Sequence, residues 1–72
     1  MKYRALFIGG RMDGQERVLV HRNRHIGMRD QPQCVYRLLF AFGKPHTLVY
    51  SLYGVEETLN RLWHRYSGED HA

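Results

Sequence analysis

Five histidines and one cysteine are the residues of this 72-residue chain most suited to ligating a metal or to covalent catalysis. His21 and His25 are four residues apart, a spacing that would place both on one face of a helix. Arg22 and Arg24 lie between them and would repel a cation, and no cysteine or carboxylate beside them completes the four ligands of a structural zinc site. The sequence therefore predicts no metal site, and we interpret this segment as a basic surface loop.

The other candidates for chemistry have simple structural interpretations. Cys34 lies beside nothing that would activate a thiol, such as the start of a helix. Gly9-Gly10-Arg11 lacks the Gly-Lys-Ser/Thr ending of a P-loop and a following helix, so turn chemistry explains both glycines. The chain also offers no paired general acid and base. We therefore expect a protein that is not an enzyme, with no cofactor and no small-molecule substrate.

Composition predicts one small folded domain that spans residues 1–72. The chain is 43% hydrophobic and 12% aromatic, which suffices for a core and excludes a disordered tail. No apolar run approaches the roughly 20 residues that span a bilayer, and the start has too few apolar residues for a signal peptide. A single cysteine suits a reducing compartment. These features predict a cytoplasmic protein without a membrane partner.

The formal net charge is +4, and the charge is unevenly distributed. Basic residues gather in the segment 21–30, whereas most acids lie near the C-terminus. A basic loop of this kind permits binding to nucleic acid or to an acidic protein surface. The candidate nucleic-acid contacts are Arg22, Arg24, His25 and Arg29.

Two strand-like runs, residues 3–8 and 16–21, predict a β-hairpin, because the Asp13-Gly14 pair between them is a strong tight-turn signal. A two-residue turn there would place Val18 and Val20 on the face of Tyr3, Ala5 and Phe7. The other face would then carry Arg4, Leu6, Ile8, Arg17 and Leu19. A wider six-residue loop is the alternative. Residues 23–33 are interpreted as a long basic loop, with a short extended piece around Ile26.

Residues 35–42 and 47–53 predict a second hairpin across the connection Gly43-Lys44-Pro45. A three-residue loop would pair Leu38 with Tyr50 and Phe40 with Leu48, on a face that also carries Tyr36 and Phe42. The opposite face would carry Arg37, Leu39, Val49 and Tyr53. The sequence thus predicts an α+β domain, in which a four-stranded antiparallel sheet of two hairpins is covered by one C-terminal helix.

That helix is predicted over residues 55–67, ending at Gly68 before a frayed tail. Glu56 and Glu57 in the first turn complement the helix dipole. An apolar stripe recurs at helical spacing and is interpreted as core. Its members are Val55, Leu59, Leu62, Trp63 and Tyr66. We expect this stripe to cover the sheet face that carries Tyr36, Phe40 and Phe42.

A single helix cannot cover both faces of the predicted sheet, and this suggests an interaction surface. The second face would be apolar and interspersed with arginine, a composition typical of protein interfaces. The predicted interface residues are Arg4, Leu6, Ile8, Arg17, Leu19, Arg37, Leu39, Val49 and Tyr53. The alternative is that the long loop folds over this face, with Ile26 and Met28 packing against it.

The opening of the chain, residues 3–14, resembles the start of small uncharacterised proteins of tailed bacteriophages and prophages. In those proteins a short strand leads into a Gly-Gly-x-x-Asp-Gly hairpin, here Gly9-Gly10-Arg11-Met12-Asp13-Gly14. Arg11-Met12 replaces the usual proline or small residue, and the C-terminal helix has no counterpart in the pattern. The resemblance covers about the first quarter of the chain closely and the region from Tyr36 to Tyr53 loosely, and it brings no catalytic residue. It implies a phage-encoded accessory protein in the cytoplasm of a bacterial host.

Two functions follow as hypotheses. The first is a non-catalytic protein-binding module that binds and modulates a host protein, acting as a host-factor inhibitor, or binds a second copy of itself as a homodimer. The second is a small basic nucleic-acid-binding protein that uses the loop at residues 21–30.

Overall fold

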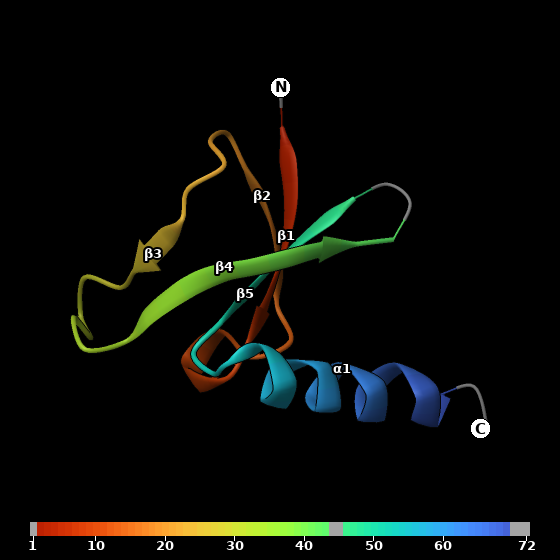
Figure 1. Cartoon of the computed structure of the whole chain (residues 1–72). Coiled ribbons are helices and arrows are strands. Elements are labelled where there is room, and N and C mark those ends of the chain that lie inside the picture. Colours follow the sequence, from red (N-terminus) through yellow and green to blue (C-terminus); the bar gives the residue numbers. More distant parts are fainter. Residues whose placement is uncertain (1, 44–45, 70–72) are drawn as a thin grey trace.

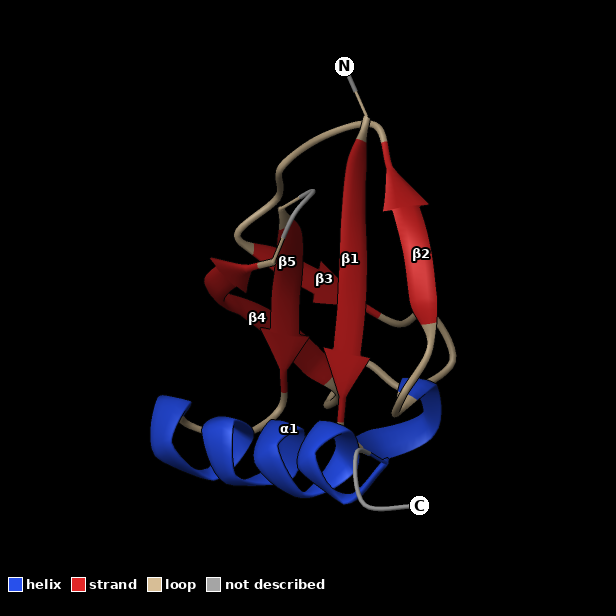
Figure 2. Ribbon diagram, turned by 90° about the vertical axis from the view of Figure 1, so that its right-hand side faces the viewer, coloured by secondary structure: helices blue, strands red, loops and turns tan. Residues whose placement is uncertain are grey.

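The computed structural model describes residues 2–43 and 46–69, with side chains as far as Arg65 (Figure 1). In chain order the elements are β1 (Tyr3–Ile8), a 3-10 turn η1 (Gly10–Met12), β2 (Glu16–Leu19), β3 (His25–Gly27), β4 (Val35–Phe42), β5 (Thr47–Ser51) and α1 (Val55–Glu69). The described residues form a five-stranded sheet in the order β2-β1-β5-β4-β3. Figure 2 shows α1 lying across one end of the strands. The α+β class with a C-terminal helix is confirmed.

The sheet is mixed, so the prediction of four antiparallel strands was wrong. β1 pairs with β5 in parallel, from Arg4 opposite Thr47 to Ile8 opposite Ser51. β3 is a fifth strand inside the predicted basic loop and pairs with β4. The physical reason is burial, because the last four residues of β1 and all of β5 are buried. Parallel neighbours are usually covered on both faces, and their strands read as continuous apolar runs.

The first hairpin has the wider connection rather than a two-residue turn at Asp13-Gly14. The two strands stay linked as far as Phe7, whose amide donates to the Gln15 carbonyl at 3.0 Å and whose carbonyl accepts from the Gly14 amide at 2.7 Å. The 3-10 turn takes up the intervening residues and shifts the register by an odd number of residues, so Tyr3 faces Leu19. Because an odd shift exchanges the faces of a strand, Arg17 and Leu19 lie on the face of Tyr3 and not on that of Arg4. This corrects the predicted grouping.

The second hairpin is present, and Leu38 faces Tyr50 as predicted. A bulge between Leu38 and Phe40 then shifts the register, so Phe40 faces Val49 rather than Leu48. Phe40 and Phe42 therefore lie on the opposite face from Tyr36. The connection that was predicted at Gly43-Lys44-Pro45 lies partly outside the described residues.

Each face of the sheet carries its own core. The tyrosine-side core contains Ala5, Phe7, Tyr36, Leu48 and Tyr50, and residues from η1 and from the segment 20–33 pack against it. The helix-side core contains Leu6, Ile8, Val49 and Leu62. The helix therefore covers the face opposite to the one expected, and Ile26 and Met28 pack against the tyrosine side. β5 runs directly into α1, and the buried Thr58 hydroxyl lies 2.7 Å from Ser51 Oγ, which holds the helix on the Ser51 face.

The helix buries a different stripe from the one predicted. Thr58 and Leu62 are buried, whereas Val55, Leu59 and Trp63 are 50%, 51% and 69% exposed. Leu62 was predicted correctly, and the side chain of Tyr66 lies outside the described residues. α1 also continues through Gly68 to Glu69. The helix crosses the end of the sheet (Figure 2), so one edge of its apolar arc, at Leu62, is buried, while the other, at Leu59 and Trp63, faces solvent. At 15 residues, α1 is the longest helix described, and no described helix meets the length and apolarity of a membrane span.

Two polar contacts attach the first connection to the rest of the fold. Asp13 accepts a hydrogen bond from the Gly9 amide at 2.7 Å and pairs with Arg65 of α1 at 2.8 Å. The Gly9 hydrogen bond, followed by Arg65, lowers the pKa of the Asp13 carboxyl below its ordinary value of 3.8. The fully buried Tyr36 hydroxyl donates to the Gly9 carbonyl at 2.6 Å and accepts from the Met12 amide at 3.1 Å.

We predict that Tyr36→Phe destabilises the protein by about 1–3 kcal/mol, because the Gly9 carbonyl and the Met12 amide would lose their partner in the interior. Urea unfolding followed by circular dichroism measures the change. Tyr53→Phe is the matched control, since the Tyr53 hydroxyl makes no hydrogen bond within the described part of the chain. Equal stabilities of the two variants would contradict the role given to Tyr36.

Candidate functional site

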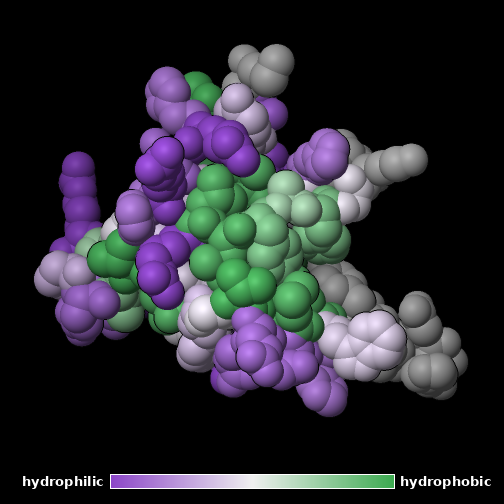
Figure 3. Space-filling view, viewed as in Figure 1, coloured by the Kyte–Doolittle hydropathy of each residue, from purple (hydrophilic) through white to green (hydrophobic). Residues whose placement is uncertain are grey.

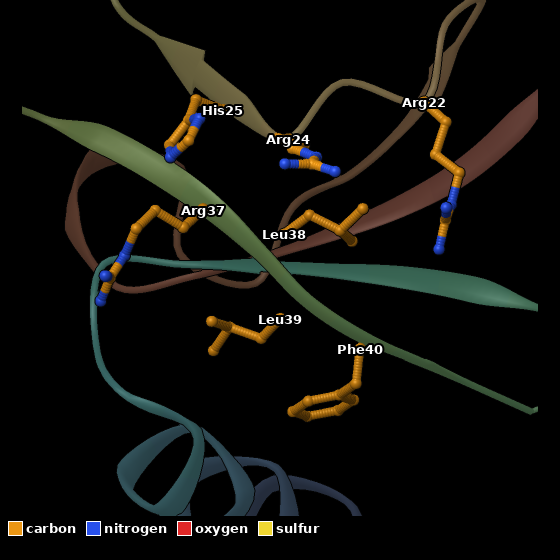
Figure 4. A pocket seen from close by; sticks show the side chains of 7 residues that line it. All are labelled: Arg22, Arg24, His25, Arg37, Leu38, Leu39 and Phe40. Atoms are coloured by element: carbon orange, nitrogen blue, oxygen red, sulfur yellow. The ribbon is translucent and has the colours of Figure 1, made fainter.

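A basic cleft of about 440 Å³ lies between β4 and the segment leading into β3 (Figure 4). Its lining residues, which define the basic cleft, are Arg22, Arg24, His25, Arg37, Leu38, Leu39 and Phe40. Figure 4 shows Arg22, Arg24 and His25 coming from the segment beside β4, while Leu39 and Phe40 extend from β4 toward α1. The cleft thus joins cationic side chains to an apolar wall.

Three backbone contacts position the cationic residues. β3 pairs with β4 so that His25 lies opposite Arg37. The Leu38 amide donates to the Arg24 carbonyl at 2.8 Å. The Tyr50 hydroxyl, from the sheet interior, donates to the Asn23 carbonyl. The loop containing the arginines is therefore attached to the sheet on both sides of Arg24.

The charges of the cleft are uncompensated. The ion pairs found among the described side chains join Arg11 to Asp30, Arg61 to Glu57 at 3.6 Å, and Arg65 to Asp13 at 2.8 Å. None of these pairs includes a lining residue of the basic cleft, and no carboxylate lines it. Three guanidinium groups around one cleft without a counter-charge create a positive potential that attracts anions.

Burial changes the pKa of Tyr50, whose hydroxyl donates to this loop. Burial raises the pKa of the Tyr50 hydroxyl above its ordinary value of 10.0, and the positive charge of Arg22 acts in the opposite direction. The hydroxyl is therefore neutral at physiological pH and can donate its proton to Asn23.

The structure brings together most of the predicted nucleic-acid set. Arg22, Arg24 and His25 line the basic cleft, whereas Arg29 is exposed and lies outside its lining. Arg37, which was predicted as an interface residue, joins them. Sequence reasoning missed this grouping because it depends on the pairing of β3 with β4. The sequence signal for β3 was weak, because this strand is only three residues long.

The predicted interface set is divided by the fold. Leu6, Ile8 and Val49 are buried in the helix-side core and cannot meet a partner. Arg17 and Leu19 lie on the tyrosine side, because the first hairpin has a different register. Tyr53 is half-buried, with the Arg61 guanidinium 4.1 Å from the centre of its ring. Of the predicted set, the residues that keep an accessible position on the helix side are Arg4, Arg37 and Leu39.

A second candidate surface lies on the helix side of the sheet. We call it the helix-side apolar surface and define it by Phe40, Phe42, Leu59 and Trp63. The register places Phe40 and Phe42 on the face of Val49, and Phe40 packs against the core that contains Leu62. Figure 3, which has the same viewpoint as Figure 1, shows apolar residues gathered at the centre of the molecule and bordered by hydrophilic residues. Sequence reasoning assigned all four of these residues to the core.

The remaining reactive side chains gather no further site. Cys34 is half-buried, and its thiol lies 3.5 Å from Gln31 Oε1. Among residues 2–43 and 46–69, no group of three or more histidine, cysteine or acidic side chains is placed to hold a metal ion.

We predict that Tyr50→Phe makes the protein less sensitive to alkaline pH. A pKa raised in the folded state contributes stability that is present below pH 10.0 and lost as the pH rises above it. The variant lacks this dependence, and near neutral pH it loses one hydrogen bond, worth about 0.5–1.5 kcal/mol. Urea unfolding on both sides of this pH measures the effect, with Tyr53→Phe as control. A wild-type and a Tyr50→Phe protein with parallel pH profiles would contradict it.

Comparison of the chain with protein-family models, with curated proteins and with solved structures found no match. Its function must therefore be inferred from the chemistry of its own surface.

Proposed function

We propose that this chain is a non-catalytic protein-binding module that contacts its partner through the helix-side apolar surface. The observation that carries the proposal is the exposure of Trp63, which is 69% accessible although α1 already packs its opposite edge against the sheet. Leu59, one turn earlier, is 51% exposed, and Phe42 of β4 is 37% exposed.

The arrangement of these side chains supports the proposal more than their number does. Single exposed apolar residues are common on soluble proteins, whereas contiguous patches mark interaction sites. Leu59 and Trp63 are four residues apart and therefore neighbours along one side of α1. Phe40 and Phe42 lie on the sheet face that the same helix partly covers. Tryptophan is among the residues that dominate binding energy at interfaces.

Arginines on this face of the sheet indicate the character of the partner. Arg4 and Arg37 are exposed and share the face of Phe42. Arginine is enriched at interfaces, where rim charges orient the partner and speed association. The net charge of +4 likewise favours a partner with an acidic surface. The partner surface that fits is apolar at its centre and rimmed by carboxylates.

The resemblance of the first hairpin to phage proteins supports a host protein as this partner. On this proposal the chain is a phage-encoded accessory protein that works in the bacterial cytoplasm and modulates one host factor by occupying a surface of it. A second copy of the chain is the other protein that the surface could meet.

The test is the double variant Leu59→Asp with Trp63→Ala, which removes apolar contact without touching the buried Leu62. We expect at least a roughly tenfold loss of affinity for any protein captured by the wild type, since two central contacts are removed. Val20→Asp is the matched control, because Val20 is 68% exposed but lies away from this surface.

Capture from a bacterial lysate, followed by titration of the captured protein, measures the loss, and sedimentation at rising concentration measures self-association. Circular dichroism verifies that each variant is folded. A folded double variant that captures the same proteins and self-associates as the wild type does would refute the proposal.

A further inference from the structure

The basic cleft has a cationic chemistry that the protein-binding proposal uses only at Arg37. It combines the guanidinium groups of Arg22, Arg24 and Arg37 with the imidazole of His25, and no acid lines it. Elsewhere on the described chain, Arg11, Arg61 and Arg65 are each paired with a carboxylate. Three of the described arginines without a carboxylate partner thus meet where two segments, distant in sequence, form a concave surface, while the other three lie outside it.

We propose that the basic cleft binds the phosphate groups of a single-stranded nucleic acid, with a base of the strand resting on the apolar wall. Arg22, Arg24 and Arg37 contact phosphates, and Leu39 and Phe40 contact the base. This inference goes beyond the proposed function and does not depend on it: Phe40 belongs to both sites, but Arg22 and Arg24 lie outside the helix-side apolar surface.

Phosphate fits the donors that the cleft presents. An arginine offers planar, paired N–H donors that match two phosphate oxygens, and it accepts no hydrogen bond. With no carboxylate in the lining, a cation gains nothing by entering. The hydrogen bonds to the Asn23 and Arg24 carbonyls fix the backbone that carries the arginines before a ligand arrives, which lowers the entropic cost of ordering this segment on binding.

The apolar wall favours a single strand over a duplex. Leu39 and Phe40 are half-buried and extend from β4 on the side of α1 (Figure 4). Single-strand binding sites combine a positive groove that follows the backbone with side chains on which bases stack. In a duplex the base faces are stacked on one another, so this wall would have nothing to contact.

An acidic peptide also carries anionic groups, but it fits the cleft less well. Its carboxylates would meet the arginines, whereas the wall beside them would face aliphatic stems rather than a flat ring. The cleft volume of about 440 Å³ leaves room for a planar group next to the charged one. A direct comparison of the affinities of a single-stranded nucleic acid and an acidic peptide distinguishes the two ligands.

The experiment measures fluorescence anisotropy of a labelled oligothymidine of about 12 nucleotides, within the size range of single-strand sites. Titrations are run between about 50 and 200 mM salt. Three phosphate contacts predict a slope of log affinity against log salt of about −2, or roughly −0.7 for each contact. The double variant Arg22→Ala with Arg24→Ala is expected to reduce the slope to about −0.7 and to weaken binding at least about tenfold at the lower salt.

The matched control is Arg4→Ala with Arg17→Ala, which removes the same charge from two exposed arginines outside the cleft. It is expected to change the slope by less than about half a unit, since it leaves the three phosphate contacts in place. Equal effects of the two double variants would overturn the proposal, because binding would then follow total charge. It is also overturned if the oligothymidine fails to bind, or if its duplex with oligodeoxyadenosine or a polyglutamate of equal charge binds as tightly.

Discussion

Burial of β1 and β5 on both faces is the constraint on which the rest of the structure depends. Ala5 and Phe7 face the tyrosine-side core, while Leu6 and Ile8 face the helix-side core, so neither surface of the central strands can be left to water. The described chain has one α-helix with which to cover them. The second cover is built from the 3-10 turn and the segment that holds Ile26 and Met28.

Both candidate surfaces follow from the way in which the helix covers one face of the sheet and the loop segments cover the other. The segment that covers the tyrosine side is held against β4 by the Arg24 carbonyl, and this brings its arginines beside Arg37. The helix lies across the end of the other face and leaves Phe42 and Trp63 accessible. Phe40 belongs to both surfaces and Leu39 precedes it on β4, so charged and apolar recognition meet along this strand.

Local signals in the sequence were sufficient for the elements but not for their assembly. Alternation and turn residues identified β1, β4 and the start of α1 at Val55. The parallel pairing of Leu6 with Val49 was not predictable, because no local pattern links strands so far apart in the chain. The bulge at Leu38 and Phe40 changes which face an aromatic ring takes, and nothing in the residues around it marks its position.

The residues of the candidate sites were also predictable only in part from the sequence. Clustering of charge identified Arg22, Arg24 and His25, since it needs no knowledge of the fold. Arg37 joined them through strand pairing, which the sequence did not reveal. Helical spacing identified an apolar arc that includes Leu62 and Trp63, but the spacing does not say which edge of the arc meets the sheet. That choice was made by Ser51 and Thr58, two small polar residues.

The parallel contact between β1 and β5 also has a consequence for the order in which the molecule assembles. β1 starts at Tyr3 and its central neighbour starts at Thr47, so most of the chain must leave the ribosome before the middle of the sheet can close. Contacts between such distant residues slow folding, because a large loop must be closed before they form. Until then the first hairpin lacks the neighbours that bury Leu6 and Ile8, and such exposed apolar side chains favour aggregation of a nascent chain.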